Sequence, residues 1–231
     1  MSGEPYSGVD NLEVLADAVR YNRFLVDAVV RASHGAMSAI DFGAGEGTLS
    51  TAIRERGLIV TCVEPDPRLR GRLHEHGFEV HACLGEVADD SLGYIYSLNV
   101  LEHIKDDAAS LRELYSKLRP GGRFFLYVPA LQVLFSSMDK KIGHYRRYSK
   151  SGIMQIAGDA GFVIERIEYA DSLGFPATLL YKLAGSRKGD ISATSVKIYD
   201  RLVFPVSRLL DRIGFSRMFG KNLIAVMRRP S

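Results

Sequence analysis

The chain has 231 residues, of which 46% are hydrophobic and 25% are charged. This length and composition suit one globular domain with a buried core and argue against a disordered chain. The formal net charge of +3 is too small to indicate nucleic-acid binding without a localised basic face. The longest apolar run, FFLYVPALQVLF, is shorter than the roughly 20 residues of a spanning helix, and the N-terminus lacks the pattern of an export signal. We therefore expect a cytoplasmic protein.

The two cysteines, Cys62 and Cys83, lie in apolar surroundings and lack the spacing of metal ligands. We expect both to be buried, reduced thiols. Nothing in the sequence requires a metal, so no metal site is expected.

The first predicted element is an amphipathic helix within residues 11–31, where apolar residues recur at helical spacing. Strands and helices then alternate. Strands are expected within residues 37–45, 58–66 and 78–85, from residue 93, and within 122–130; helices are expected within 48–57, 67–77 and 106–122. This alternation predicts right-handed βαβ units and a parallel sheet with helices on both faces.

After Pro129 the alternation changes. A polar loop and one helix are expected within residues 138–162, and a sixth strand within 163–171. A partly helical insert covers 173–219, which is too long for a simple hairpin, and a last strand lies within 221–230. We predict a single domain over 1–231, with an N-terminal helical cap (1–36), a cofactor-binding half (37–129) and an acceptor-side half (130–231).

The sequence AIDFGAGEG places Gly43, Gly45 and Gly47 directly after the first strand. Glycine there permits positive φ and lets a ligand touch bare backbone, at the turn where parallel α/β sheets bind ligands. The dinucleotide fingerprint G-x-G-x-x-G would need a small residue where Thr48 stands. The loop therefore differs from that of the NAD-binding proteins.

Glu64 ends the second strand, about 20 residues after the glycines, which is the spacing at which a carboxylate binds a ribose diol. Such charge-assisted hydrogen bonds are roughly twice as strong as neutral ones. Alternatively, the glycines form only a tight turn and Glu64 lies on a solvated strand end. The glycine turn and Glu64 occur together at the expected spacing, which favours a ligand with an adenosine-like ribose.

The motifs IDFGAGEG, VEPD, YIYSLNVLEHI and LRPGGRFFLYVP occur in this order between residues 37 and 129. In this half the chain resembles the class I S-adenosylmethionine-dependent methyltransferases. The resemblance implies an α/β fold: a Rossmann-like, seven-stranded, mostly parallel sheet flanked by helices, with an N-terminal helix and a helical insert before the last strand. It also implies S-adenosylmethionine as the cofactor.

The same resemblance implies the cofactor contacts. The glycine loop would pass under the methionine part, with Asp41 near its amino group and Glu64 on the ribose. Leu84 would pack on the adenine and Glu86 would lie near its amino group, while Asn99 and Val100 would flank the methionine. The expected cofactor-binding residues are Tyr21, Asp41, Gly43, Ala44, Gly45, Gly47, Glu64, Pro65, Leu84, Gly85, Glu86, Asn99 and Val100.

An oxygen or nitrogen acceptor needs a base with a pKa near neutrality, and histidine is the natural choice. His103 follows the fourth strand and His144 lies in the loop GHYRRYS, so both are candidate catalytic residues. His103 could instead cap a helix and order its loop. A segment similar to GHYRRYS recurs beside the active site in one branch of these enzymes.

The expected substrate-binding residues in this loop are Tyr145, Arg146, Arg147 and Tyr148. Its arginines could clamp an anionic acceptor, or the loop could be a solvated basic segment whose tyrosines pack on the core. Tyr21 could offer its ring to the sulfonium, or pack in the core.

In the insert, one side of a predicted helix carries Val196, Tyr199, Leu202, Val203, Val206, Leu209, Leu210 and Ile213, and another side carries basic residues. Pro205 is expected to kink or split this helix. The segment is either an amphipathic cap over the substrate cleft or a surface that contacts anionic lipid or an apolar acceptor.

We therefore expect a methyltransferase that moves a methyl group by in-line displacement to a small-molecule or lipid-like acceptor. The alternatives are a non-catalytic cofactor-binding protein of the same fold and, less well supported, an NAD-type oxidoreductase. The fourth strand reads NVLE rather than the Asn-Pro-Pro-aromatic signature of nucleobase methylation, so no nucleic-acid acceptor is expected. The sequence indicates one further partner, a membrane surface that the insert would contact peripherally.

Overall fold

The computed structural model describes residues 18–183 and 193–231. Its centre is a seven-stranded sheet in the order β3-β2-β1-β4-β5-β7-β6. The strands are β1 (Ser38–Phe42), β2 (Ile59–Val63), β3 (Glu79–His81), β4 (Leu92–Leu98), β5 (Leu118–Pro129), β6 (Val163–Ala170) and β7 (Asn222–Arg228). The first five strands pair in parallel, and β7 is inserted antiparallel between β5 and β6. The predicted mostly parallel, seven-stranded sheet is confirmed.

Side-chain alternation along the central strands builds a core on each face of the sheet. In β5, Phe124 and Leu126 join one core cluster, whereas Phe125 and Tyr127 join the other. This division follows from the two-residue period of a strand. Both faces are apolar because both are covered by helices.

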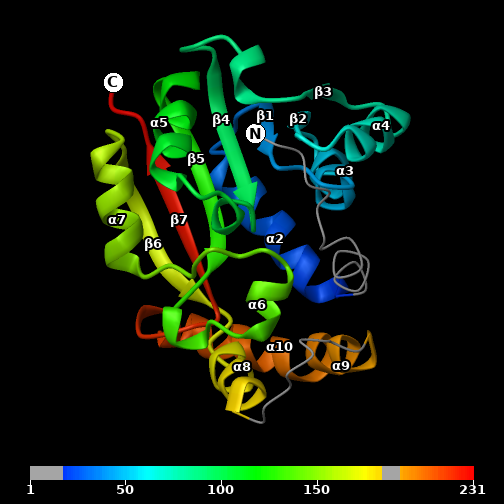
Figure 1. The fold of residues 1–231 in the computed structure, drawn as a ribbon, viewed down its shortest axis with the longest axis vertical. Helices are drawn as coiled ribbons and strands as arrows, with labels where there is room; N and C mark the ends of the chain where they lie inside the picture. The colour runs from blue at the N-terminus through cyan, green and yellow to red at the C-terminus, as the bar shows by residue number, and fades with distance from the viewer. Residues whose placement is uncertain (1–17, 184–192) are drawn as a thin grey trace.

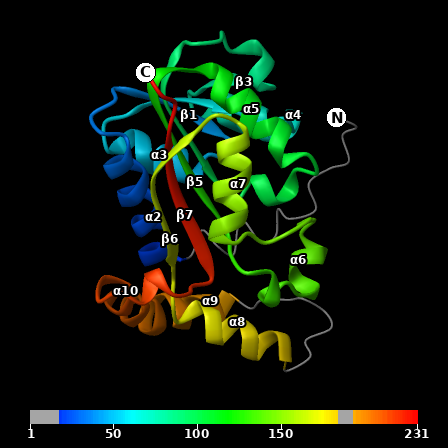
Figure 2. The same cartoon turned by 90° about the vertical axis from the view of Figure 1, so that its left-hand side faces the viewer.

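The helices form two layers around the sheet (Figures 1 and 2). One core cluster contains residues of α2 (Val19–Ala32), α3 (Thr48–Glu55) and α4 (Pro67–Glu75). The opposite cluster contains residues of α5 (Asp107–Lys117) and α7 (Lys150–Asp159). The helix predicted within residues 11–31 is present as α2, and its first residues lie outside the described part of the chain.

The acceptor-side half holds several short helices. These are α6 (Ser137–Lys141), α8 (Gly174–Leu183), α9 (Ala193–Ile198), a π-helical turn (Tyr199–Val203) and α10 (Phe204–Arg212). Pro205 stands in the first turn of α10, and the helical run 193–212 passes through the π-helical turn just before it. Figure 1 shows α6, α8, α9 and α10 gathered at the end of the sheet where β5 ends and β7 begins.

The prediction of two buried cysteines is half right. Cys62 is buried in the middle of β2, but Cys83 is exposed. Cys83 lies past the end of the edge strand β3, where the chain has left the covered part of the sheet. Both thiols are free.

Candidate active site

The glycine loop follows β1 and is tied to the end of β2. The backbone amide of Gly43 donates to the carbonyl of Val63 at 2.8 Å, and the amide of Gly45 donates to Glu64 Oε2 at 2.9 Å. Gly43, Gly45 and Gly47 have φ values of +85°, +58° and +80°. This left-handed backbone requires glycine and confirms the expected turn geometry.

The end of β4 packs against the same loop. A Cβ atom added to Gly43 would lie 2.4 Å from Val100 Cγ2, so the bare backbone of Gly43 makes this close approach possible. Asn99 just before it has φ +56°, a conformation that asparagine tolerates better than most residues. The fold thus brings the two sequence-predicted parts of the cofactor site together.

Two buried carboxyl groups flank the loop. Burial raises the pKa of Glu64, even though the amides of Asp66 and Gly45 donate hydrogen bonds to it. Burial raises the pKa of Asp41 to about 7, and the Ser50 hydroxyl donates to Asp41 Oδ2 at 2.6 Å. Carboxylates held in this way favour hydroxyl or ammonium groups of a ligand as further partners.

The loop after β3 contains Leu84 and Glu86, the residues predicted to contact adenine. Leu84 is buried, while Glu86 is exposed and accepts a hydrogen bond from the amide of Ala82 at 3.1 Å. Gly85 lies between them in a turn of 3-10 helix, and Pro65 follows Glu64 at the end of β2. Their contacts with adenine stay predictions.

His103 and His144 are brought together from distant parts of the sequence. Their ring centroids lie 4.6 Å apart in an edge-to-face arrangement. Val100, which contacts Gly43, immediately precedes the 3-10 turn Leu101–His103, so the histidine pair lies next to the loop expected to hold the cofactor. The expectation that both histidines belong to one site is consistent with this geometry.

Two acids that the sequence did not single out support the histidines. Asp139 Oδ1 lies 2.8 Å from His144 Nδ1, and Glu102 Oε1 lies 3.7 Å from His144 Nε2. Asp139 precedes His144 by five residues and Glu102 stands directly before His103. The sequence shows an acid close to each candidate histidine. Spacing along the chain does not determine, however, whether the acid and the histidine side chains point toward each other.

Burial and neighbouring charges shift the pKa values of His103, Glu102 and Asp139 in different directions. Burial, with a smaller contribution from His144, lowers the pKa of His103 to about 4. Burial raises the pKa of Glu102 to about 8. For Asp139, burial alone would raise the pKa, but the hydrogen bond with His144 and the charge of Arg147 lower it to about 2. Glu102, His103 and His144 are also the described residues whose ligand atoms could together hold a metal ion.

The loop residues predicted to bind substrate have different surroundings. Arg147 is almost fully buried and pairs with Asp139 at 2.9 Å, and the buried Tyr148 hydroxyl donates to Asp107 Oδ2 at 2.9 Å. Arg146 pairs with Asp107 and is about one-third exposed, and Tyr145 is 55% exposed. Arg147 and Tyr148 therefore position the loop, while Tyr145 and Arg146 reach its surface.

Tyr21 of α2 lies in an aromatic cluster beside this site. Its ring packs edge-to-face on Tyr127 and Phe204, with centroids 6.2 and 5.4 Å apart. The side chains of Tyr127 and Asn99 lie near its hydroxyl, and burial raises the pKa of Tyr21. Core packing of Tyr21 is thus observed, and its contact with Asn99 links the N-terminal helix to the predicted cofactor site.

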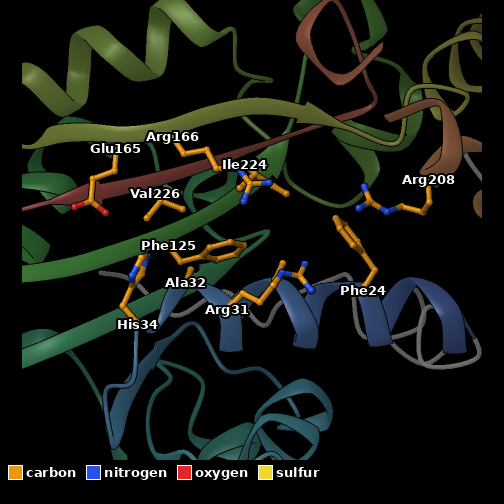
Figure 3. Close-up of a pocket in the computed structure, with 11 residues that line it drawn as sticks. Phe24, Arg31, Ala32, His34, Phe125, Glu165, Arg166, Arg208, Ile224 and Val226 are labelled. Atoms are coloured by element: carbon orange, nitrogen blue, oxygen red, sulfur yellow. The ribbon is translucent and has the colours of Figure 1, made fainter. Parts of the chain in front are cut away.

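A surface hollow between α2 and the strands β6 and β7 lies outside this arrangement (Figure 3). Phe24 and Arg31 of α2 line it, together with Arg166 of β6 and Val226 of β7. None of the predicted site residues lines this hollow. The hollow is therefore separate from the candidate active site.

Comparison with known proteins decides the family. A family model described as a methyltransferase domain matches residues 18–167. The chain belongs to the methyltransferase-domain family. This methyltransferase is 28% identical to an uncharacterized methyltransferase of Mycolicibacterium paratuberculosis over 175 residues, 67% of this chain and 68% of that protein.

Two further comparisons extend this result. Over 105 residues the methyltransferase is 30% identical to the ubiquinone biosynthesis O-methyltransferase of Pseudomonas entomophila, covering 41% of this chain and 45% of that protein. Its fold is similar to that of the Haemonchus contortus phosphoethanolamine N-methyltransferase 2 in complex with S-adenosyl-L-methionine. That match has a TM-score of 0.59 and 20% identity, and it covers 90% of this chain and 52% of the other.

The cofactor is S-adenosylmethionine, as the family implies. The residues present fit it, because the left-handed backbone of Gly43, Gly45 and Gly47 lies beside Glu64, a buried carboxylate that can accept hydrogen bonds from hydroxyl groups. When bound, the cofactor supplies an electrophilic methyl group on a sulfonium. Within residues 18–183 and 193–231, no helix is both long and apolar enough to cross a membrane. The cytoplasmic location stays a prediction.

Proposed function

We propose that this methyltransferase transfers a methyl group to a small-molecule or lipid-like acceptor bound beside His103 and His144. The observation that carries the proposal is the contact between Gly43 and Val100, which places the histidine pair immediately beyond the glycine loop. Asp139 orients His144 through Nδ1 at 2.8 Å. A histidine oriented by a carboxylate is the arrangement that proton transfer needs.

The reaction is an in-line displacement at the methyl carbon. The acceptor loses a proton, its lone pair forms the new bond to carbon, and the electrons of the carbon–sulfur bond go to sulfur. The paired histidines promote the loss of the acceptor's proton, and the packed site holds the two reactants in line. S-adenosylhomocysteine leaves as the neutral product.

The cofactor-binding roles follow from the same placement. Glu64 holds the ribose hydroxyls with its remaining lone pairs, and Asp41 faces the amino group. Tyr21 and Asn99, whose side chains lie near each other, close the methionine end of the cleft. The exposed Tyr145 and partly exposed Arg146 contact the acceptor, and Arg147 and Tyr148 hold their loop in place.

Separate binding and turnover measurements test this proposal. We expect His144→Ala and Arg146→Ala to lower the release of S-adenosylhomocysteine with a panel of phenols, alcohols and amines. Both variants should bind S-adenosylhomocysteine as tightly as the wild type in calorimetry, since His144 pairs with Asp139 and Arg146 pairs with Asp107, outside the glycine loop. His74→Gln, at an exposed histidine of α4, is the matched control. Equal loss of cofactor binding in both variants would contradict the acceptor-side assignment.

The insert supports a lipid-like acceptor. Its inner side is held by polar contacts: Asp211 accepts hydrogen bonds from the amides of Asp171 and Ser172, and the Ser207 hydroxyl accepts one from the amide of Leu173. These contacts turn the apolar side of the helix outward. Leu202, Val206, Leu209 and Ile213 form a stripe that is 63%, 50%, 59% and 68% exposed.

We infer that this outer stripe contacts an anionic membrane surface. Exposed basic residues flank it, namely Lys197, Arg201, Arg212 and Arg217. The two acids of residues 193–219, Asp200 and Asp211, are both buried. An apolar stripe with basic flanks is the composition of an interfacial helix. A lipid-like acceptor could then be reached from the membrane, which agrees with a relative whose name places O-methylation in ubiquinone biosynthesis.

Vesicle co-sedimentation tests this inference. We expect binding at low salt to vesicles containing phosphatidylglycerol, weaker binding to pure phosphatidylcholine, and release as salt screens the charges. Leu209→Ser combined with Ile213→Ser should abolish binding, whereas Met37→Ser, at a 74% exposed residue elsewhere, should not. Binding that survives the double substitution, or a dimer in light scattering that depends on the stripe, would contradict a membrane contact.

A further inference from the structure

Three potential metal ligands converge beside the glycine loop. Glu102, His103 and His144 each offer one ligand atom, and these atoms all lie within 4.8 Å of one another. Glu102 and His103 come from the turn after β4, and His144 comes from the loop before α7. Small side-chain movements bring such atoms to the spacing of ligands around one ion.

The carboxylate of Glu102 lacks a hydrogen-bond partner. The residue is fully buried, and neither oxygen has a hydrogen-bond partner among the described residues at normal geometry. An uncompensated buried carboxylate is costly, and buried charges are ordinarily paired or coordinated to a metal. A cation between Glu102 and the two imidazoles removes this cost.

The histidines are oriented as metal ligands are. Asp139 engages His144 Nδ1 at 2.8 Å, which leaves Nε2 directed toward Glu102 Oε1, 3.7 Å away. The ring of His103 has a hydrogen bond with the backbone of Gly143. A ligating histidine almost always gives its other ring nitrogen to a carboxylate or a backbone carbonyl, which fixes its tautomer.

We propose that Glu102, His103 and His144 bind one divalent transition-metal ion of the Zn²⁺ type. Two imidazoles and one carboxylate form a donor set that suits Zn²⁺, Co²⁺ or Fe²⁺ and not Ca²⁺ or Mg²⁺. Three protein ligands leave a coordination position open, as in catalytic metal sites. Asp139 is then a positioning residue that holds His144.

The role of this ion rests on the proposed function and narrows the acceptor to an oxygen compound. An alcohol or phenol that occupies the open position loses its proton to solvent more readily, because a bound cation lowers the pKa of a coordinated hydroxyl. The resulting oxygen attacks the methyl carbon as the carbon–sulfur bond breaks. The histidines thus promote proton loss from the acceptor as ligands of the ion.

Cobalt titration of the untagged protein, stripped with a chelator, tests the site without turnover. We expect one Co²⁺ per chain with the visible bands of a four- or five-coordinate ion, displaced by Zn²⁺. Glu102→Gln and His144→Gln should weaken binding by more than about tenfold, since even the outer partners of ligands change metal affinity by about 10–100-fold. His81→Gln, which removes a surface histidine near Glu79 and Glu86, should bind Co²⁺ as the wild type does.

Calorimetry with S-adenosylhomocysteine on the same samples shows that each variant is folded. A variant that binds S-adenosylhomocysteine normally but has lost the cobalt bands supports the site. A wild type that turns over an acceptor without binding Co²⁺ refutes the metal site and leaves the proposed function standing. A wild type that binds Co²⁺ but turns over no acceptor refutes the proposed function instead. Unchanged cobalt binding in Glu102→Gln overturns the assignment of ligands.

Discussion

Glu64 Oε2 accepts a hydrogen bond from the backbone amide of Gly45 at 2.9 Å, and Glu64 Oε1 accepts one from the amide of Asp66 at 3.0 Å. One carboxylate therefore joins the glycine loop to the end of β2. A charged acceptor in this position both shapes the loop and remains able to receive hydroxyl donors from a ribose.

Replacing Glu64 by Gln should weaken cofactor binding. A glutamine can accept at only one atom, so one of the two backbone amides loses its partner, and the charge-assisted bonds to the ribose are lost. Hydrogen bonds to charged groups contribute roughly 1.5–3 kcal/mol, so calorimetry should show at least about a tenfold loss of S-adenosylhomocysteine affinity. Asp66→Asn, which keeps an N-cap on α4, should leave the affinity near the wild-type value. Wild-type affinity in Glu64→Gln would refute the ribose assignment.

Gly43→Ala should disrupt both the fold and the cofactor site. Alanine at φ +85° is strained, and its Cβ would lie 2.4 Å from Val100 Cγ2. We expect the free energy of unfolding to fall by at least about 1–3 kcal/mol in urea denaturation. Gly71→Ala lies inside α4 with open space around the added Cβ, so it should instead stabilise by about 0.5–1 kcal/mol. Similar stabilities of the two variants would show that the packing of Val100 on Gly43 is not tight.

Asp200 should act as an N-cap supplied from another part of the chain. Its carboxylate accepts hydrogen bonds from the amides of Arg20 and Tyr21 in the first turn of α2, at 3.0 and 2.8 Å, and Ala18 offers no cap of its own. Asp200→Ala should lower the free energy of unfolding by about 1 kcal/mol and speed amide exchange at Tyr21. The neighbouring exposed Arg201→Ala is the control. Unchanged amide exchange would contradict the cap.

The stability of the protein should depend on pH through Asp41. Burial raises its pKa from the ordinary 3.8 to about 7 in the folded state, so folding favours the protonated form. The stabilisation that protonated Asp41 contributes to folding is therefore complete below pH 3.8. It declines as the pH rises toward 7 and is lost above that. Asp41→Asn removes this decline while an amide oxygen still accepts from Ser50.

Urea denaturation at pH 4, 6 and 8 measures this effect. The stability of Asp41→Asn relative to the wild type should increase across the series and level off above the folded pKa. Glu79→Gln, at a residue whose side chain is 71% exposed, should show no such trend. A difference that is constant with pH would mean that folding does not raise the pKa of Asp41.

Most of the cofactor half could be predicted from local pattern. Periods of two and 3.6 residues located the elements from β1 to β5, and the spacing of the glycines and Glu64 located the loop that they share. The apolar residues of the insert fit two roles, covering a cleft or contacting a lipid, and the sequence does not distinguish between these roles. The buried Ser207 and Asp211 show which side of α10 faces the protein.

The sequence by itself determined the alternating α/β order, the glycine turn and the acid at the end of β2, because each depends on residues close together along a backbone with fixed periods. Only the tertiary structure decided that Glu102, His103 and His144 meet and that Asp139 orients His144. Glu102 and His103 follow β4, whereas Asp139 belongs to α6 and His144 to the loop after it. Packing against the whole fold decides whether side chains from two such distant segments point toward each other. The same reason explains why Asp200 caps a helix far from it in the chain.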